Sequence, residues 1–168
     1  MAELLRLEGL SRRYIATQAL DAVDLTIHAG EVLCLAGMNG SGKSTLLKCI
    51  AGAEEPDQGS IIWQGRRFPR LTPTRAMRLG IQVIYQDLSI FPDLSVAENI
   101  AFQSIQRRAP FWIDWPAVRA AAAAALATLG AILPLDTRLG DLPIGARKTA
   151  AIARAMTQDC QLLVMDEL

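Results

Sequence analysis

The stretch Gly37-Met38-Asn39-Gly40-Ser41-Gly42-Lys43-Ser44 fits the pattern G-x-x-x-x-G-K-[ST] of the phosphate-binding P-loop. An apolar run at residues 31–36 precedes it and predicts a buried strand, and a helical pattern from Ser44 to Ala51 follows it and stops at Gly52. Strand, glycine-rich turn and helix are the context in which this pattern binds phosphate. We therefore interpret the stretch as a P-loop rather than as a glycine-rich turn with a chance Lys-Ser pair.

The chemistry of a P-loop is anion binding. Glycines let successive backbone N–H groups point into one hollow, and the helix start adds unpaired N–H groups and the positive end of its dipole. Lys43 can reach the β- and γ-phosphates of a nucleotide, and the Ser44 hydroxyl can hold Mg²⁺. The predicted nucleotide-binding residues of this segment are Gly37, Met38, Asn39, Gly40, Ser41, Gly42, Lys43, Ser44 and Thr45.

The bulk composition indicates a folded domain with no marked preference for nucleic acid. The chain has 168 residues, of which 51% are apolar, so it can form a core. Its 17 basic and 17 acidic residues give a net charge of +0, which provides no argument for a nucleic-acid partner. Five arginines crowd residues 66–78, and we favour a solvated face there over a basic contact patch.

Cysteine spacing argues against a zinc site or a disulfide framework. The three cysteines, Cys34, Cys49 and Cys160, are far apart and include no C-x-x-C pair. We expect Cys34 and Cys49 to be small buried hydrophobic residues, in a chain suited to a reducing, cytoplasmic setting. The single histidine, His28, is expected at the surface without a functional role, and Trp63 and Trp112 are expected to pack rather than to contact a ligand.

No signal peptide or membrane span is predicted. Charged residues interrupt the N-terminus, and the longest uncharged stretch, residues 120–135, is broken by Gly130 and Pro134. We expect any membrane association to come through a partner.

Periodicity and turn signals predict alternating strands and helices. Strands are expected at residues 4–9, 19–27, 60–65, 81–85 and 162–165. Helices are expected to begin at Thr72-Pro73, near Ser95 as a short helix with Glu98 completing a capping box, at Asp114, and at Pro143. This layout predicts an α/β P-loop core with a mainly helical insertion at about residues 87–145.

A pair of acidic residues follows the last predicted strand. Asp166 and Glu167 come directly after the apolar residues 162–165. Downstream of a P-loop, the first carboxylate can hold Mg²⁺ and the second can orient and deprotonate an attacking water. A strand ending in two exposed acids is common, so this interpretation depends on the P-loop.

Taken in order, these motifs resemble the ATP-binding subunit of an ABC transporter. Tyr14 lies where that family has an aromatic residue that stacks on adenine, and Gln86 matches the Q-loop glutamine, which touches Mg²⁺ and faces the membrane subunit. Leu142-Pro-Ile-Gly145 resembles the signature motif, and residues 163–167 resemble Walker B with its catalytic glutamate, Glu167. Two simpler alternatives stay open, since Tyr14 could be a strand-edge aromatic and Gln86 a solvated loop residue.

The resemblance implies a fold, cofactors and partners. The expected fold is a P-loop NTPase of ABC-cassette type, with an N-terminal β subdomain and the helical insertion. Expected ligands are ATP and Mg²⁺, the latter held by Ser44, Gln86 and Asp166. Expected partners are a second cassette, fused or as a homodimer, and transmembrane permease subunits, without nucleic acid. The location implied is peripheral, at the cytoplasmic face of the membrane, or cytoplasmic if the chain is unassembled.

A finer resemblance is to sugar importers of the ribose, galactose and xylose type. It is carried by residues 80–100, Gly-Ile-Gln-Val-Ile-Tyr-Gln-Asp-Leu-Ser-Ile-Phe-Pro-Asp-Leu-Ser-Val-Ala-Glu-Asn-Ile. Proteins of this branch usually carry two cassettes in one polypeptide. The resemblance therefore implies the front part of a first cassette that energises import of a sugar-like solute.

The chain departs from the family pattern in two places. Pro143 stands where the signature motif has serine and Ala146 where it has glutamine, and proline has neither a hydroxyl nor an N–H. In the family the serine hydroxyl and the glycine amide bind the γ-phosphate of a partner's ATP, so here the hydroxyl is missing while the Gly145 amide and the helix N-terminus remain available. The sequence stops at Leu168, before the family's D-loop and switch histidine, which suggests a partial ABC ATPase domain over residues 1–168. These departures keep open a vestigial or regulatory module that binds ATP without turnover. A non-transport ABC ATPase acting on DNA or ribosomes is a weaker alternative.

Overall fold

The computed structural model describes residues 2–85, 90–107 and 113–166 and divides the chain into two compact units, Met1–Ile81 and Gln82–Leu168. The first unit contains β1 (Glu3–Tyr14), β2 (Thr17–His28), α1 (Lys43–Ala51), β3 (Gln58–Trp63), β4 (Arg66–Phe68) and α2 (Pro73–Arg78). From the unit boundary onward the chain forms β5 (Ile81–Ile84), α3 (Val96–Arg107), α4 (Trp115–Thr128), the 3₁₀ turn η1 (Leu139–Asp141), α5 (Ile144–Met156) and β6 (Leu162–Met165). Gln86, Trp112, Glu167 and Leu168 lie outside the described residues.

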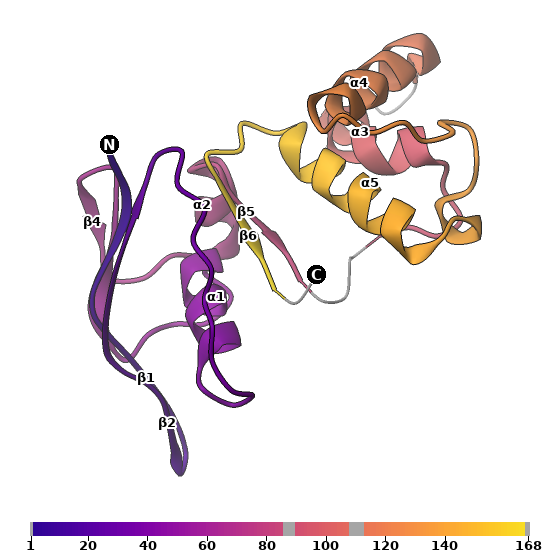
Figure 1. The fold of residues 1–168 in the computed structure, drawn as a ribbon. Helices are drawn as coiled ribbons and strands as arrows, with labels where there is room; N and C mark the ends of the chain where they lie inside the picture. Colours follow the sequence, from indigo (N-terminus) through magenta and orange to yellow (C-terminus); the bar gives the residue numbers. More distant parts are fainter. Residues whose placement is uncertain (1, 86–89, 108–112, 167–168) are drawn as a thin grey trace. The chain divides into compact units, whose positions relative to one another are not determined.

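A four-stranded antiparallel sheet in the order β2-β1-β3-β4 is the base of the first unit. Both of its helices, α1 and α2, lie on one side of this sheet (Figure 1). Leu5 and Leu7 on β1 are completely or almost completely buried, as is Ile61 on β3, because alternate residues of these strands face the core. Trp63 is also buried, so its predicted packing role is confirmed.

The ends of α1 and α2 match their sequence signals. Helix α1 ends at Gly52, whose left-handed backbone donates an N–H to the Cys49 carbonyl. Helix α2 begins after Thr72, whose hydroxyl accepts the Arg75 N–H at 3.3 Å. Cys49 is buried as predicted, and this burial raises the pKa of its thiol to about 11.

The predicted buried strand at residues 31–36 is wrong. This segment has no strand conformation, and Val32 is 98% exposed and Leu33 41% exposed. Cys34 is exposed as well, which contradicts its predicted burial. A strand needs a neighbour for its N–H and C=O groups, and none of the strands in the described ranges pairs with residues 31–36. Residues 31–36 therefore have the apolar composition of a strand, but they do not pair with a neighbouring strand in the described residues.

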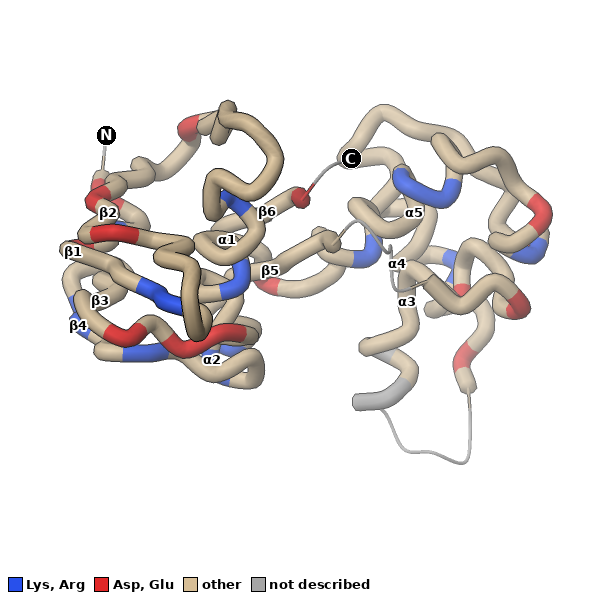
Figure 2. Tube along the Cα trace, turned by 90° about the horizontal axis from the view of Figure 1, so that it is seen from below, with Lys and Arg blue, Asp and Glu red and all other residues tan. Residues whose placement is uncertain are grey.

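The five arginines of residues 66–78 belong to a face with mixed charge. Arg67 pairs with Glu8 and donates to the Ser60 hydroxyl, and Arg70 pairs with Glu55. Figure 2 shows acidic and basic positions side by side in this unit. These pairs support the solvated face over a basic contact patch.

Three helices form the core of the second unit. Helices α3, α4 and α5 enclose a cluster that includes Val96, Ile100, Ala122 and Ala153. Alanines on α4 and α5 allow close packing because they fill little space between helices. Within the described residues, no helix is long and apolar enough to cross a membrane.

The helix starts predicted in this unit are confirmed, although α3 is longer than the short helix expected. The Ser95 hydroxyl accepts the Glu98 N–H at 3.2 Å, and the Glu98 carboxylate accepts the Ser95 N–H at 2.8 Å, which is a capping box. Asp114 accepts the Ala117 N–H at 3.0 Å and begins α4.

Strands β5 and β6 form a separate two-stranded sheet. Ala151 and Ala155 of α5 pack in one buried cluster with Ile84 of β5, and Leu163 of β6 is half-buried against it. The N–H of Asp166 donates to the Ile84 carbonyl at 3.0 Å, so Asp166 is fixed directly after the end of β6.

Candidate functional site

The P-loop is a turn that leads directly into α1. Residues 37–42 are irregular, and Lys43 is the first residue of the helix. Gly42 has φ +90°, and a Cβ atom there would lie 2.2 Å from the Ala19 carbonyl oxygen. Glycine is therefore required at this position, both by the backbone conformation and by the close approach of β2.

The N-terminus of α1 is suited to an anion. It has no side-chain cap and no acidic residue in its first turn. The first N–H groups of a helix lack partners within the helix, and its dipole favours negative charge at this end. In α2, α3 and α4 a side-chain oxygen from Thr72, Ser95 or Asp114 caps the same region instead.

Lys43 folds back over the loop that precedes it. Its ammonium donates to the carbonyl oxygens of Gly37 at 2.8 Å and Met38 at 2.9 Å. The Ser41 N–H also donates to the Met38 carbonyl, at 3.2 Å, and closes the turn. The cation is thus held against the glycine-rich loop by two neutral acceptors.

The other predicted residues of this segment surround Lys43. Met38, Asn39, Gly40, Ser41 and Ser44 are exposed, and Thr45 is half-buried at the first turn of α1. The structure therefore brings residues 37–45 together in one exposed loop and helix start.

Tyr14 lies at the end of β1, where the β1–β2 hairpin turns. Tyr14 is 38% exposed, and the Arg12 guanidinium carbon lies 5.0 Å from the ring centroid. Arg12 pairs across the hairpin with Leu20, whose side chain is one of the groups nearest to Gly42. The hairpin end that carries Tyr14 is therefore connected to the P-loop through β2.

Arg12 was not singled out by sequence reasoning. It donates to Asp57 at 2.8 Å and to Glu54 at 3.2 Å, both in the segment between α1 and β3. Interaction with Tyr14 is the largest cause that raises the pKa of Arg12, followed by its contacts with Asp57. The sequence could have indicated the contact between Arg12 and Tyr14, because residues two apart on a strand lie on the same face and Arg12 is two residues before Tyr14.

The predicted acidic pair, Asp166 and Glu167, belongs to the second unit. Asp166 follows β6, and its charge is the second cause, after burial, that raises the pKa of Tyr85. Gln86 and Glu167, the predicted metal-contacting glutamine and catalytic glutamate, lie outside the described residues. The structure therefore describes Asp166 beside Tyr85, within this unit.

The degenerate signature motif is the start of α5. Pro143 is the residue before the helix and provides no side-chain cap, and the first turn has no acidic residue. Arg147 braces the preceding turn by donating to the carbonyls of Leu142 at 2.8 Å and Gly140 at 2.6 Å. A Cβ atom on Gly145 would meet nothing within 4 Å, so this glycine faces open space.

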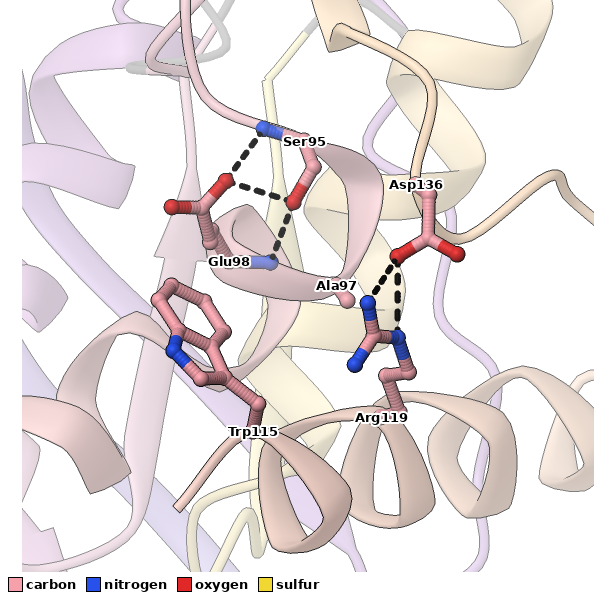
Figure 3. A pocket seen from close by; sticks show the side chains of 6 residues that line it. All are labelled: Ser95, Ala97, Glu98, Trp115, Arg119 and Asp136. Carbon is pink, nitrogen blue, oxygen red and sulfur yellow. Dashed lines mark hydrogen bonds and ion pairs between the residues drawn. The ribbon is translucent and has the colours of Figure 1, made fainter. Parts of the chain in front are cut away.

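A hollow of about 370 Å³ lies beside the starts of α3 and α4. Figure 3 shows Trp115 and Arg119 projecting from α4 toward Glu98 and Asp136. Arg119 pairs with Asp136 at 2.8 Å, and the carboxylate of Glu98 accepts the Ser95 hydroxyl at 2.6 Å. These charged groups serve the fold, so the glycine-rich loop is the better candidate site.

The chain belongs to the ABC transporter family, because the model of that family matches residues 20–168. Among curated relatives, it is 43% identical over 166 residues to Ribose import ATP-binding protein RbsA 2 of Streptomyces avermitilis, with 99% of this chain and 33% of that protein covered. It is 38% identical to Ribose import ATP-binding protein RbsA of Caldanaerobacter subterraneus, with 99% and 34% covered. The chain thus spans about a third of the length of the curated relatives it matches.

Solved structures show the same fold. An ATP-binding cassette of an ABC transporter in its ADP conformation superposes with a TM-score of 0.85 at 28% identity, covering 99% of this chain and 69% of that one. The protein cbiO1 of Clostridium perfringens, part of the ABC transporter complex cbiONQ, gives a TM-score of 0.82 at 26% identity, with 99% and 66% covered. The predicted P-loop NTPase fold of ABC-cassette type is confirmed.

Proposed function

We propose that this chain is an ATP-binding subunit that energises import of a sugar-like solute through an ABC transporter. The observation that carries the proposal is the P-loop, where Lys43 and an uncapped helix start adjoin a turn in which Gly42 is sterically required. Similarity to two ribose import ATP-binding proteins supports the sugar-like solute.

The roles of the residues follow from their chemistry. Residues 37–45 would surround the phosphates with backbone N–H groups, and Lys43 would exchange its carbonyl partners for phosphate oxygens. Tyr14 would stack on the adenine face. Glu167 would orient and deprotonate the attacking water.

Magnesium fits the donors that these motifs supply. Ser44 offers a hydroxyl at the first turn of α1, and Asp166 offers a carboxylate at the end of β6. Mg²⁺ prefers hard oxygen ligands, and Gln86 would add a further amide oxygen. When bound, Mg²⁺ neutralises part of the phosphate charge.

ABC ATP-binding subunits act in pairs and with transmembrane permease subunits. For this chain we propose a second cassette, fused or as a homodimer, and a permease that holds it at the cytoplasmic face of the membrane. Within the partial ABC domain of residues 1–168, the helical subdomain at about residues 87–145 would be the part inserted between the P-loop core and the Walker B strand.

The test is binding of Mg-ATP to the chain by isothermal titration calorimetry, with Lys43→Ala and Lys48→Ala compared. Lys48 is an exposed lysine on the same helix, so its removal changes the charge equally without touching the loop. We expect Lys43→Ala to abolish measurable binding and Lys48→Ala to retain it. Retained affinity in Lys43→Ala would refute the site.

A second measurement separates binding from turnover. Steady-state hydrolysis of ATP, compared with its binding, distinguishes a transport ATPase from a module that only binds ATP. We expect hydrolysis once the chain is assembled with its second cassette and permease. Binding without hydrolysis in that assembly would contradict the proposed activity.

A further inference from the structure

A network of charged residues connects the Tyr14 hairpin to the segment that follows α1. Arg12 donates to Asp57 at 2.8 Å and to Glu54 at 3.2 Å. Asp57 in turn accepts the backbone N–H of Arg13 at 2.7 Å and donates its own N–H to the Ser11 carbonyl at 2.8 Å. These bonds join two segments that are more than 40 residues apart in the sequence.

The guanidinium in this network also covers an aromatic ring. The Arg12 guanidinium carbon lies over the Tyr14 ring, 5.0 Å from its centroid, while the residue remains 38% exposed. A cation over one face of an aromatic ring is attractive, and its planar guanidinium can stack there. With one face covered, the opposite face is the one on which a purine can stack.

Arg12 holds this position at some cost in solvation. Its Nε atom is buried and has no hydrogen-bond partner in the described ranges. Buried polar atoms normally have partners, so an arginine fixed in this way calls for an explanation beyond a surface ion pair.

We propose that Arg12 is a positioning residue of the adenine site. Anchored by Asp57 and Glu54, its guanidinium holds the Tyr14 ring in the orientation in which the open face receives the purine. This inference rests on the proposed function, because it presupposes that Tyr14 stacks on adenine.

The network also explains how the ring is placed relative to the P-loop. Arg12 pairs with Leu20 across the hairpin, and Leu20 is next to Gly42 at the start of α1. Glu54 and Asp57 lie directly after the other end of the same helix. The ring is thus tied to both ends of the helix that would bind the phosphates, and this fixes the spacing between base and phosphate subsites.

The experiment measures dissociation constants of the 168-residue chain for Mg-ATP and for magnesium tripolyphosphate, which has phosphates but no base. We expect Arg12→Ala to weaken Mg-ATP binding about three- to tenfold and to leave tripolyphosphate binding unchanged. Arg13→Ala is the matched control, because Arg13 contributes only its backbone N–H to the network, and we expect wild-type affinity for both ligands.

A double-mutant cycle with Tyr14→Ala tests whether Arg12 acts through the ring. Once Tyr14 is removed, we expect Arg12→Ala to have no further effect on Mg-ATP affinity. Arg12→Lys keeps a charge for the two carboxylates without the planar guanidinium, and we expect it to fold and to lose about as much affinity as Arg12→Ala.

Several results would overturn the inference while leaving the proposed function intact. They are wild-type Mg-ATP affinity in Arg12→Ala or Arg12→Lys, an equal loss for tripolyphosphate, or a further loss in the Tyr14→Ala background. Failure of the wild-type chain to bind Mg-ATP would instead overturn the proposed function, and this inference with it.

Discussion

Helices α1 and α5 both begin without a side-chain cap, yet their surroundings differ. At α1 the preceding residue, Gly42, is left-handed and lies against the Ala19 carbonyl of β2. At α5 the preceding residue is Pro143, and the glycine in the first turn, Gly145, faces open space. The Cβ position of the glycine is thus blocked by backbone at the first helix start and open at the second. This difference agrees with the proposal that α1 binds the nucleotide of this chain and that α5 meets a nucleotide held by a partner.

The largest effect on stability is expected from a substitution at Gly42, directly before α1. Gly42→Ala would place a Cβ 2.2 Å from a backbone oxygen at a φ of +90°. Because the obstacle is backbone and alanine disfavours this φ, we expect a loss of about 3 kcal/mol or more in the free energy of unfolding. Urea denaturation measures this loss. A loss below about 1 kcal/mol would show that the loop can move away from β2.

The capped start of α3 is the reference for the uncapped starts of α1 and α5. Ser95→Ala removes the hydroxyl that accepts the Glu98 N–H in the capping box of α3. We expect the free energy of unfolding to fall by about 1–2 kcal/mol, in the same urea assay. Thr128→Ala is the control, since this hydroxyl only bonds back to the Ala124 carbonyl, and we expect a change below about 0.5 kcal/mol. Equal changes in the two variants would contradict a capping role.

The open helix start should tolerate a side chain. Gly145→Ala places its Cβ where nothing lies within 4 Å, and alanine is a better helix former than glycine. We therefore expect a gain of about 0.5 kcal/mol in the free energy of unfolding. A loss of more than about 1 kcal/mol would mean that the first turn of α5 is as constrained as that of α1.

The smallest change in stability is expected for Pro143→Ser. The serine hydroxyl would cap α5 and gain about 1 kcal/mol, but losing the rigid proline costs about 0.4–1 kcal/mol through the unfolded state. The net change should stay within about 0.5 kcal/mol. Since the hydroxyl would also face the partner's ATP, we expect ATP hydrolysis by the paired cassettes to rise. An unchanged hydrolysis rate would show that the proline does not limit this site.

Elements specified by local signals were predicted well from the sequence. The capping box of Ser95 and Glu98, the Asp114 cap and the Gly52 terminus each depend on residues within a few positions of one another. The glycine-rich loop was found for the same reason, because all its determinants lie in residues 37–44.

Features that depend on distant partners were missed or misjudged. Residues 31–36 have the composition of a buried strand, but pairing is decided by other segments, and Val32 and Leu33 are exposed in the structure. The Arg12 network joins residues more than 40 positions apart, so no local pattern reveals its partners. Within this network, a local pattern indicates only that Arg12 and Tyr14 lie on the same face of their strand.

The two hydrogen bonds of Lys43 have a consequence for the choice of ligand. An ammonium has three N–H donors, and Lys43 directs two of them at the carbonyl oxygens of Gly37 and Met38, so a ligand competes with these oxygens for the cation. A neutral acceptor offers no more than those carbonyls do, whereas an anionic oxygen adds the Coulomb attraction between opposite charges. We therefore expect the loop to favour polyanions over uncharged nucleosides.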